Sequence, residues 1–114
     1  VYAIELDGEA IPDAEANVVR NGVAQLVHVF EGDAGVLLPL VAPVRVVLAN
    51  IISSVLLELL PLIRQALTSD GAAILSGILL EEREGMLVAL ESAGWTVVAE
   101  DAEGLWWSVS IVPA

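Results

Sequence analysis

The sequence contains no cysteine and no lysine, and 16 acidic residues outnumber its four arginines, so the formal net charge is -12 at pH 7. Without cysteine, the chain can form neither a disulfide nor a thiolate metal site, and nothing indicates an oxidising compartment. The single histidine, His28, has no second histidine or cysteine beside it, and no metal site is predicted. The excess of acid argues against direct binding to nucleic acid phosphates and suits a basic partner better. A simpler explanation stays open, because negative charge keeps an apolar chain in solution.

The sequence also lacks an apolar run long enough to cross a membrane, which takes roughly 18 or more residues. The longest candidate, Val46 to Leu60, is interrupted by Asn50, Ser53, Ser54 and Glu58. No signal peptide is visible, and we expect a cytoplasmic protein without membrane contact. A chain of 114 residues is one domain at most. Because it opens directly on a strand-like run, we expect it to begin in the middle of a domain.

The most informative stretch runs from Val46 to Ile52, where one Asn interrupts an otherwise apolar segment. A continuous run rich in β-branched residues predicts a strand buried on both faces of a parallel sheet, here over residues 44–51. Asn50 comes where this strand should end. In open α/β sheets, ligands bind just beyond the carboxyl ends of the strands, so Asn50 is placed where chemistry would occur. The alternative is a polar cap between the strand and the next helix.

The rest of the chain alternates between strand and helix patterns. We expect further strands at 1–6, 25–30, 72–79, 95–100 and 105–112, and helices at 11–21, 53–68 and 81–93. Residues 35–43, which include two prolines, are expected to form a loop, and residues 69–71 and 101–104 to form turns. This order predicts an α/β fold with a doubly wound, mostly parallel sheet that ends in an antiparallel hairpin.

Several motifs together resemble a known enzyme family. The first set resembles the second strand and following helix of class I S-adenosylmethionine-dependent methyltransferases: Glu5-Leu6-Asp7, residues 13–17 and residues 20–23. The second set resembles the branch that modifies large-subunit ribosomal protein eleven, the PrmA family: Val47-Leu48-Ala49-Asn50-Ile51, Leu75-Ser76-Gly77-Ile78-Leu79, Gly94-Trp95 and Glu103-Gly104-Leu105-Trp106. The resemblance runs from end to end and implies a Rossmann-like fold.

The resemblance also shows what the chain lacks. Enzymes of this family carry a Gly-rich loop after their first strand, and no Gly-x-Gly-x-Gly occurs here. We therefore expect residues 1–114 to be the carboxyl-terminal portion of one methyltransferase catalytic domain, without the first strand. The missing amino-terminal segment of the same enzyme would be a partner, and the chain alone would be inactive. One departure from the family is Arg45, where an Asp is usual.

The resemblance implies that S-adenosylmethionine is the cofactor and that Glu5, Leu6, Asp7, Asp33 and Asn50 contact it. Glu5, at the end of a strand, would accept hydrogen bonds from the ribose diol, and the alternative is a solvated acid. Asp7 fits the turn better than it fits the ribose. Asp33 would lie near the adenine amino group, although Asp in a Gly-containing turn is equally explained by turn chemistry.

The resemblance gives Asn50 a catalytic role as well, in which its amide carbonyl positions the acceptor amine without acid-base catalysis. The expected reaction is transfer of a methyl group from S-adenosylmethionine to amino groups of a basic ribosomal protein. Two alternatives remain: another methyltransferase of this fold, acting on a small molecule or a different protein, and a catalytically silent interaction module. The three tryptophans are expected to cover the core or the hairpin.

Overall fold

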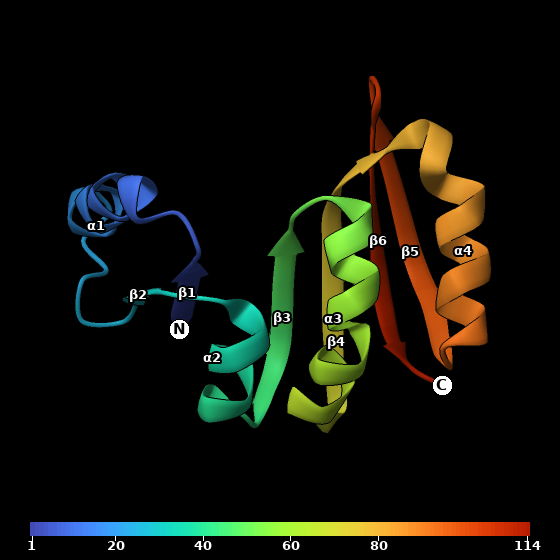
Figure 1. The fold of residues 1–114 in the computed structure, drawn as a ribbon, viewed down its shortest axis with the longest axis horizontal. Helices are drawn as coiled ribbons and strands as arrows, with labels where there is room; N and C mark the ends of the chain where they lie inside the picture. Colours follow the sequence, from blue (N-terminus) through green and yellow to red (C-terminus); the bar gives the residue numbers. More distant parts are fainter. The chain divides into compact units, whose positions relative to one another are not determined.

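The computed structural model describes all 114 residues of the chain (Figure 1). They form two compact units, Val1–Val41 and Ala42–Ala114. The first unit holds a two-stranded sheet and the second a four-stranded sheet. None of the helices combines the length and the apolarity that crossing a membrane would require.

The first unit contains two parallel strands and two α-helices. Its elements are β1 (Tyr2–Glu5), η1 (Gly8–Ala10), α1 (Ile11–Arg20), β2 (His28–Glu31) and α2 (Ala34–Val41). β1 pairs with β2 in parallel, so that their carboxyl ends lie at the same edge of the sheet. Helix α1 has the predicted ends, because Pro12 lies in its first turn and Gly22 follows it with a φ of 68°.

Helix α2 lies where the sequence predicted a loop, and that prediction is wrong. Asp33 starts the helix, because its Oδ1 accepts a hydrogen bond from the Gly35 N–H at 2.8 Å. Pro39 lies inside the helix, where its missing N–H removes one hydrogen bond, and Leu38 is buried. The cap and the burial of Leu38 therefore outweigh the local preferences of Gly and Pro. With α2 in place, strands and helices alternate from β1 to β5 without a gap.

The second unit has a mixed sheet with strand order β3-β4-β6-β5. Its elements are β3 (Val44–Asn50), α3 (Ser53–Ala66), β4 (Leu67–Leu79), η2 (Leu80–Glu82), α4 (Arg83–Ser92), β5 (Trp95–Glu103) and β6 (Trp106–Pro113). β3 and β4 are parallel, whereas β6 runs antiparallel to both of its neighbours. The predicted α/β fold with a terminal antiparallel hairpin is confirmed.

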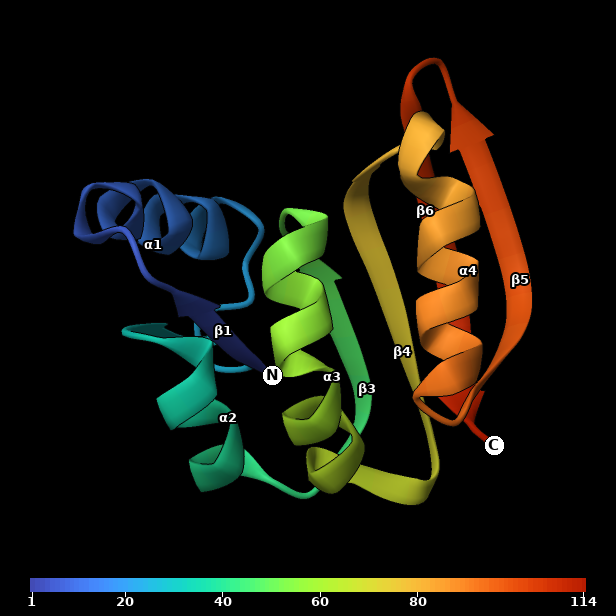
Figure 2. The ribbon, with the colours of Figure 1, turned by 45° about the vertical axis from the view of Figure 1, so that its right-hand side comes forward.

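Helices α3 and α4 lie on the same side of the four-stranded sheet (Figure 2). The core of the unit is on this side, where fully buried side chains come from both helices and from β4 and β6: Leu56, Ile63, Leu75, Ile78, Leu90, Val109 and Ile111. The other face of β3 carries Val46 and Leu48, which are 56% and 74% exposed. β3 pairs only with β4, so its second edge has no partner. One face and one edge of this sheet are thus uncovered.

Two predicted turns belong to strands instead. Residues 69–71 lie within β4, although its pairing with β3 is interrupted there between Leu67 and Ala72. Asp70 in this segment lies 3.4 Å from Arg45, the residue that departs from the family pattern, in an exposed ion pair of little energetic weight. Residues 101–103 lie within β5, because pairing with β6 continues to Glu103. Strand pairing outweighs the turn preference of Asp and Gly in both segments.

β4 bulges at Ser76 and Gly77, next to the end of β3. The register of β4 with β6 shifts between Leu75 and Ile78. On its other side, Ser76 of β4 pairs with Asn50 of β3. Gly77 has a φ of 77°, and a Cβ there would lie 2.7 Å from Asn50 Oδ1 and 3.0 Å from the Ile51 carbonyl oxygen. The chain needs Gly here for its backbone conformation and for space. β4 therefore approaches the end of β3 closely at this position.

We predict that Gly77→Ala destabilises the chain by at least about 1–2 kcal/mol, the usual strain of a side chain at positive φ. Gly85→Ala is the matched control. Gly85 lies in α4 with open space around it, so the same substitution should stabilise by about 0.5–1 kcal/mol. Urea unfolding of both variants measures the two effects. Equal effects of the two substitutions would contradict this account of Gly77.

We predict that the uncovered β3 makes the isolated chain prone to aggregate through strand pairing. Leu48→Lys places a charge on this strand and should lower light scattering during refolding several-fold. Leu48 is largely exposed, so its substitution should change stability by less than about 0.5 kcal/mol. Val88→Lys is the control, because Val88 is 66% exposed on α4, away from the sheet edge. If both variants scatter alike, general solubility and not the strand controls aggregation.

Candidate functional site

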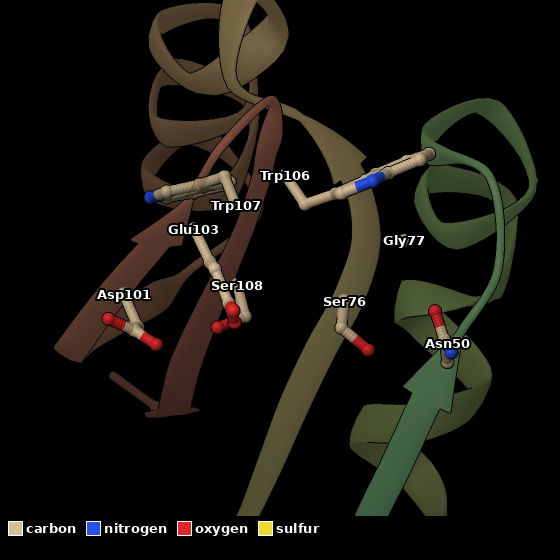
Figure 3. Close-up of a pocket in the computed structure, with 8 residues that line it drawn as sticks. All are labelled: Asn50, Ser76, Gly77, Asp101, Glu103, Trp106, Trp107 and Ser108. Atoms are coloured by element: carbon tan, nitrogen blue, oxygen red, sulfur yellow. The ribbon is translucent and has the colours of Figure 1, made fainter.

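A cavity of about 420 Å³ opens where β3, β4 and β5 reach their carboxyl ends and β6 begins (Figure 3). Parallel β3 and β4 bring their carboxyl ends together, and the antiparallel hairpin brings the start of β6 beside the end of β5. Eight residues from these four strands and their turns line it: Asn50, Ser76, Gly77, Asp101, Glu103, Trp106, Trp107 and Ser108.

Asn50 forms one end of this cavity. The residue is exposed, and its side chain makes no hydrogen bond within the chain. Ile52, not Asn50, precedes α3, and no side chain caps that helix. The alternative interpretation, in which Asn50 caps the helix, therefore does not hold. Its amide carbonyl and amino groups are both free to bind a ligand.

The loops after β3 and β4 are joined by Glu82. The Ser53 hydroxyl, at the start of α3, donates a hydrogen bond to Glu82 Oε2. The other oxygen, Glu82 Oε1, accepts the Leu79 N–H at 3.2 Å. One carboxylate thus links the first turn of α3 to the end of β4, which holds in place the two chain segments that flank Asn50.

The opposite wall of the cavity comes from the β5–β6 hairpin. Asp101 pairs with Ser108 and Glu103 pairs with Trp106, so these four residues share one face of the hairpin. Trp106 is 56% exposed, although most tryptophan surface in folded proteins is covered. An aromatic ring and two carboxylates therefore line this wall.

Glu100 and Trp107 have a structural role on the helical face of the hairpin. Glu100 accepts hydrogen bonds from Arg83 Nε at 2.6 Å and from the buried Trp107 Nε1 at 3.0 Å. The Arg83 hydrogen bond holds the pKa of the Glu100 carboxyl below its ordinary value; desolvation acts in the opposite direction, and the Trp107 hydrogen bond adds to the lowering. These contacts join the start of α4 to the hairpin and fix the back of the cavity wall.

Four of the five predicted cofactor contacts lie in the first unit, at the carboxyl ends of β1 and β2. Glu5 is half-buried at the end of β1, opposite Glu31 in register. Its Oε1 accepts the Asp7 N–H at 3.1 Å, and its other oxygen has no partner. The placement of Glu5 at a strand end agrees with the sequence-based expectation. The carboxylate can accept further hydrogen bonds there.

Asp7 and Asp33 have local structural roles. Asp7 Oδ1 accepts the Glu9 N–H at 2.9 Å and so caps η1, as turn chemistry predicts. Asp33 caps α2, and both carboxylates are exposed. Leu6 lies between Glu5 and Asp7 with 73% of its surface exposed. Four of the five predicted contact residues therefore gather at one edge of the first sheet, and the fifth, Asn50, lines the cavity of the second unit.

Four lining residues were not predicted from the sequence to belong to a site: Asp101, Glu103, Trp106 and Ser108. The two acids were expected in a turn, and the tryptophans were expected to cover the core or the hairpin. A usable signal was present, because Asp101 and Glu103 are two residues apart, as are Trp106 and Ser108. That period of two puts each pair on one face of a strand. Nowhere in the chain do three or more His, Cys, Asp or Glu side chains gather in a way that could hold a metal ion.

Comparison with known proteins now gives the family. The family described as "Ribosomal protein L11 methyltransferase (PrmA)" matches residues 1–113. A protein of that name from Desulforamulus reducens is 35% identical over 108 residues, which are 95% of this chain and 34% of that protein. Another from Pelotomaculum thermopropionicum is 40% identical over 107 residues, covering 93% of this chain and 34% of that protein. The chain spans about a third of the length of these curated relatives.

A solved structure gives the same result. The ribosomal protein L11 methylase of Lactobacillus delbrueckii subsp. bulgaricus superposes with a TM-score of 0.87 at 25% identity, covering 99% of this chain and 57% of the other. The resemblance found in the sequence motifs is therefore confirmed over almost every residue. The chain belongs to the ribosomal protein L11 methyltransferase (PrmA) family.

Proposed function

We propose that residues 1–114 are the carboxyl-terminal portion of one catalytic domain, in a cytoplasmic enzyme that methylates amino groups of a ribosomal protein. The observation that carries this proposal is the free amide of Asn50 in a cavity at the carboxyl ends of β3 and β4, in a chain of this family. Ligands of open α/β sheets bind at this position. The missing amino-terminal segment of the same enzyme would be its partner.

S-adenosylmethionine, when bound, supplies an activated methyl group on a positively charged sulfur. The residues of the first unit fit its ribose, because Glu5 has one carboxylate oxygen without a partner at the end of β1. A carboxylate accepts hydrogen bonds from two hydroxyls more strongly than a neutral side chain can. Exposed Leu6 and Asp33 lie at the same edge and would border the nucleotide.

Asn50 would hold the acceptor amine. The amide carbonyl accepts an N–H from the amine and leaves the nitrogen lone pair free to attack the methyl carbon. The cofactor would supply the methyl group from its sulfur, and the methylated amine would release its proton to solvent. The contribution of Asn50 is positioning, since an amide neither takes nor gives a proton at neutral pH.

Two other functions remain in competition with this one. A methyltransferase of the same fold could act on a small molecule or on a different protein, and a silent interaction module could keep the fold without turnover. A net charge of -12 favours a basic protein as substrate. A full-length enzyme that carries this chain is assayed for methyl transfer to a purified ribosomal protein and to a small amine. Transfer to the ribosomal protein supports the proposed function, and transfer only to the small amine supports a small-molecule methyltransferase. Transfer to neither supports the silent interaction module.

We predict that Glu5→Gln in this enzyme raises the apparent KM for the cofactor about tenfold with little change in kcat. Ribose contacts are present in ground and transition states alike, and a charged hydrogen bond contributes about 1.5–3 kcal/mol. Glu9→Gln is the matched control, because Glu9 lies nearby in η1 and its side chain has no partner. Steady-state kinetics at saturating substrate measure both variants. An unchanged KM in Glu5→Gln would move the ribose contact elsewhere.

We predict that Asn50→Ala lowers turnover about a hundredfold, the usual scale for a lost positioning contact, with cofactor affinity nearly intact. Its melting temperature should stay close to that of the wild type, because the side chain makes no hydrogen bond within the chain. Asn17→Ala, on the exposed face of α1, controls for loss of an amide. Turnover that persists while the melting temperature falls would make Asn50 a structural residue.

A further inference from the structure

The two ends of the cavity differ in chemistry (Figure 3). Asn50 lies at one end, with a neutral amide that can hold an amine. Asp101 and Glu103 lie at the other end, on the same face of β5. The exposed ring of Trp106 and the hydroxyl of Ser76 lie between them. A ligand that fills the cavity therefore meets an amide, an apolar surface and two negative charges in turn.

The charge on this wall has no counterpart within the chain. Neither Asp101 nor Glu103 takes part in an ion pair or a side-chain hydrogen bond, and no arginine lines the cavity. The three arginines of the second unit are engaged elsewhere: Arg45 pairs with Asp70, Arg64 donates to the Gly94 and Ala114 carbonyls, and Arg83 pairs with Glu100. A cationic ligand would neutralise the wall without displacing any internal contact.

The methylated amine itself does not fit the carboxylate end. An amine must lose its charge before its nitrogen can attack a methyl group, and two neighbouring carboxylates would keep it protonated. Asn50 offers a hydrogen-bond acceptor without a charge, so it does not favour the protonated form of the amine. The separation of the two ends is thus a chemical requirement if both ends contact the same substrate.

We propose that the cavity binds a substrate segment with two cationic groups. The amine to be methylated lies at Asn50, and a second basic side chain of the same segment lies between Asp101 and Glu103, with its aliphatic part against Trp106. The assignment of the Asn50 end rests on the proposed methyl transfer. The carboxylate end makes the site selective for an amine that has a basic residue as its neighbour.

Peptide binding by a full-length enzyme that carries this chain, with no cofactor added, tests this inference without any turnover. The peptides come in pairs. In each pair, one peptide carries a Lys with an Arg nearby, and the other carries Gln in place of that Arg. The position of the Arg relative to the Lys differs from pair to pair, on both sides of the Lys. The indole N–H signal of Trp106, assigned through Trp106→Phe, reports binding in the ¹⁵N-labelled enzyme. The best Arg peptide should bind about fivefold more tightly than its Gln pair, as exposed ion pairs of this kind allow. Added salt should reduce the difference.

Asp101→Asn combined with Glu103→Gln should bring the ratio of the two dissociation constants to about one. Glu91→Gln is the charge-matched control, because Glu91 is exposed on α4 and does not line the cavity. It should keep the preference for Arg. Equal binding of the paired peptides by the wild-type enzyme, absence of binding to either, or a preference that survives in the double variant would each overturn the inference.

The test separates this inference from the proposed function. If the full-length enzyme methylates a ribosomal protein but shows no preference between the peptides, the inference is wrong and the function stands. If the enzyme prefers the Arg peptide but transfers no methyl group to any amine, the cavity is a cation-binding site in a protein without the proposed activity.

Discussion

The close approach of the β4 backbone to Asn50 is the contact on which the cavity depends. Gly77 takes a positive φ and leaves no room for a Cβ between β4 and the end of β3. The bulge at Ser76 and Gly77 also shifts the register between β4 and β6, so that two residues of β4 oppose one of β6 beside the cavity before pairing resumes at Ile78. Because a Cβ at position 77 would lie 2.7 Å from Asn50 Oδ1, the glycine at the bulge leaves the Asn50 amide its space in the cavity.

Alternation along the hairpin separates structural from ligand-facing residues. Glu100 and Trp107 point to the helices, where Glu100 accepts hydrogen bonds from both Trp107 and Arg83. Asp101 and Glu103 point to the opposite face and bind nothing. Adjacent acids on one strand thus have different tasks because side chains of a strand alternate between its faces. The first group fixes the hairpin, and the second is left free for a partner.

The strands and most helices follow from the apolar pattern of the sequence, because burial decides these elements. The same reasoning placed Glu5 and Asn50 at strand ends, where the structure has them. It failed where local preference and long-range pairing disagree. Residues 35–41 look like a loop from Gly35 and Pro39, but a cap and a buried Leu make them helical. Residues 101–103 look like a turn from their composition, but their partners lie on β6, and only the period of two in Asp101 and Glu103 indicates a strand.

Because residues 101–104 were expected to form a turn, the carboxylate wall of the cavity was not predicted from the sequence. Read as a turn, Asp101 and Glu103 are two solvated acids; read as a strand, they form one wall of a cavity. The charge balance of the chain then explains why this wall is bare. Four arginines cannot pair with 16 acids, so the placement of the arginines decides which carboxylates are neutralised. The three arginines of the second unit tie strands and helices together and do not line the cavity, so neither Asp101 nor Glu103 has an arginine partner. In a chain this acidic, the carboxylate wall of the cavity therefore depends on the placement of the arginines as well as on the acids. The arginines stabilise the fold elsewhere, and the carboxylates of Asp101 and Glu103 are left without a basic partner.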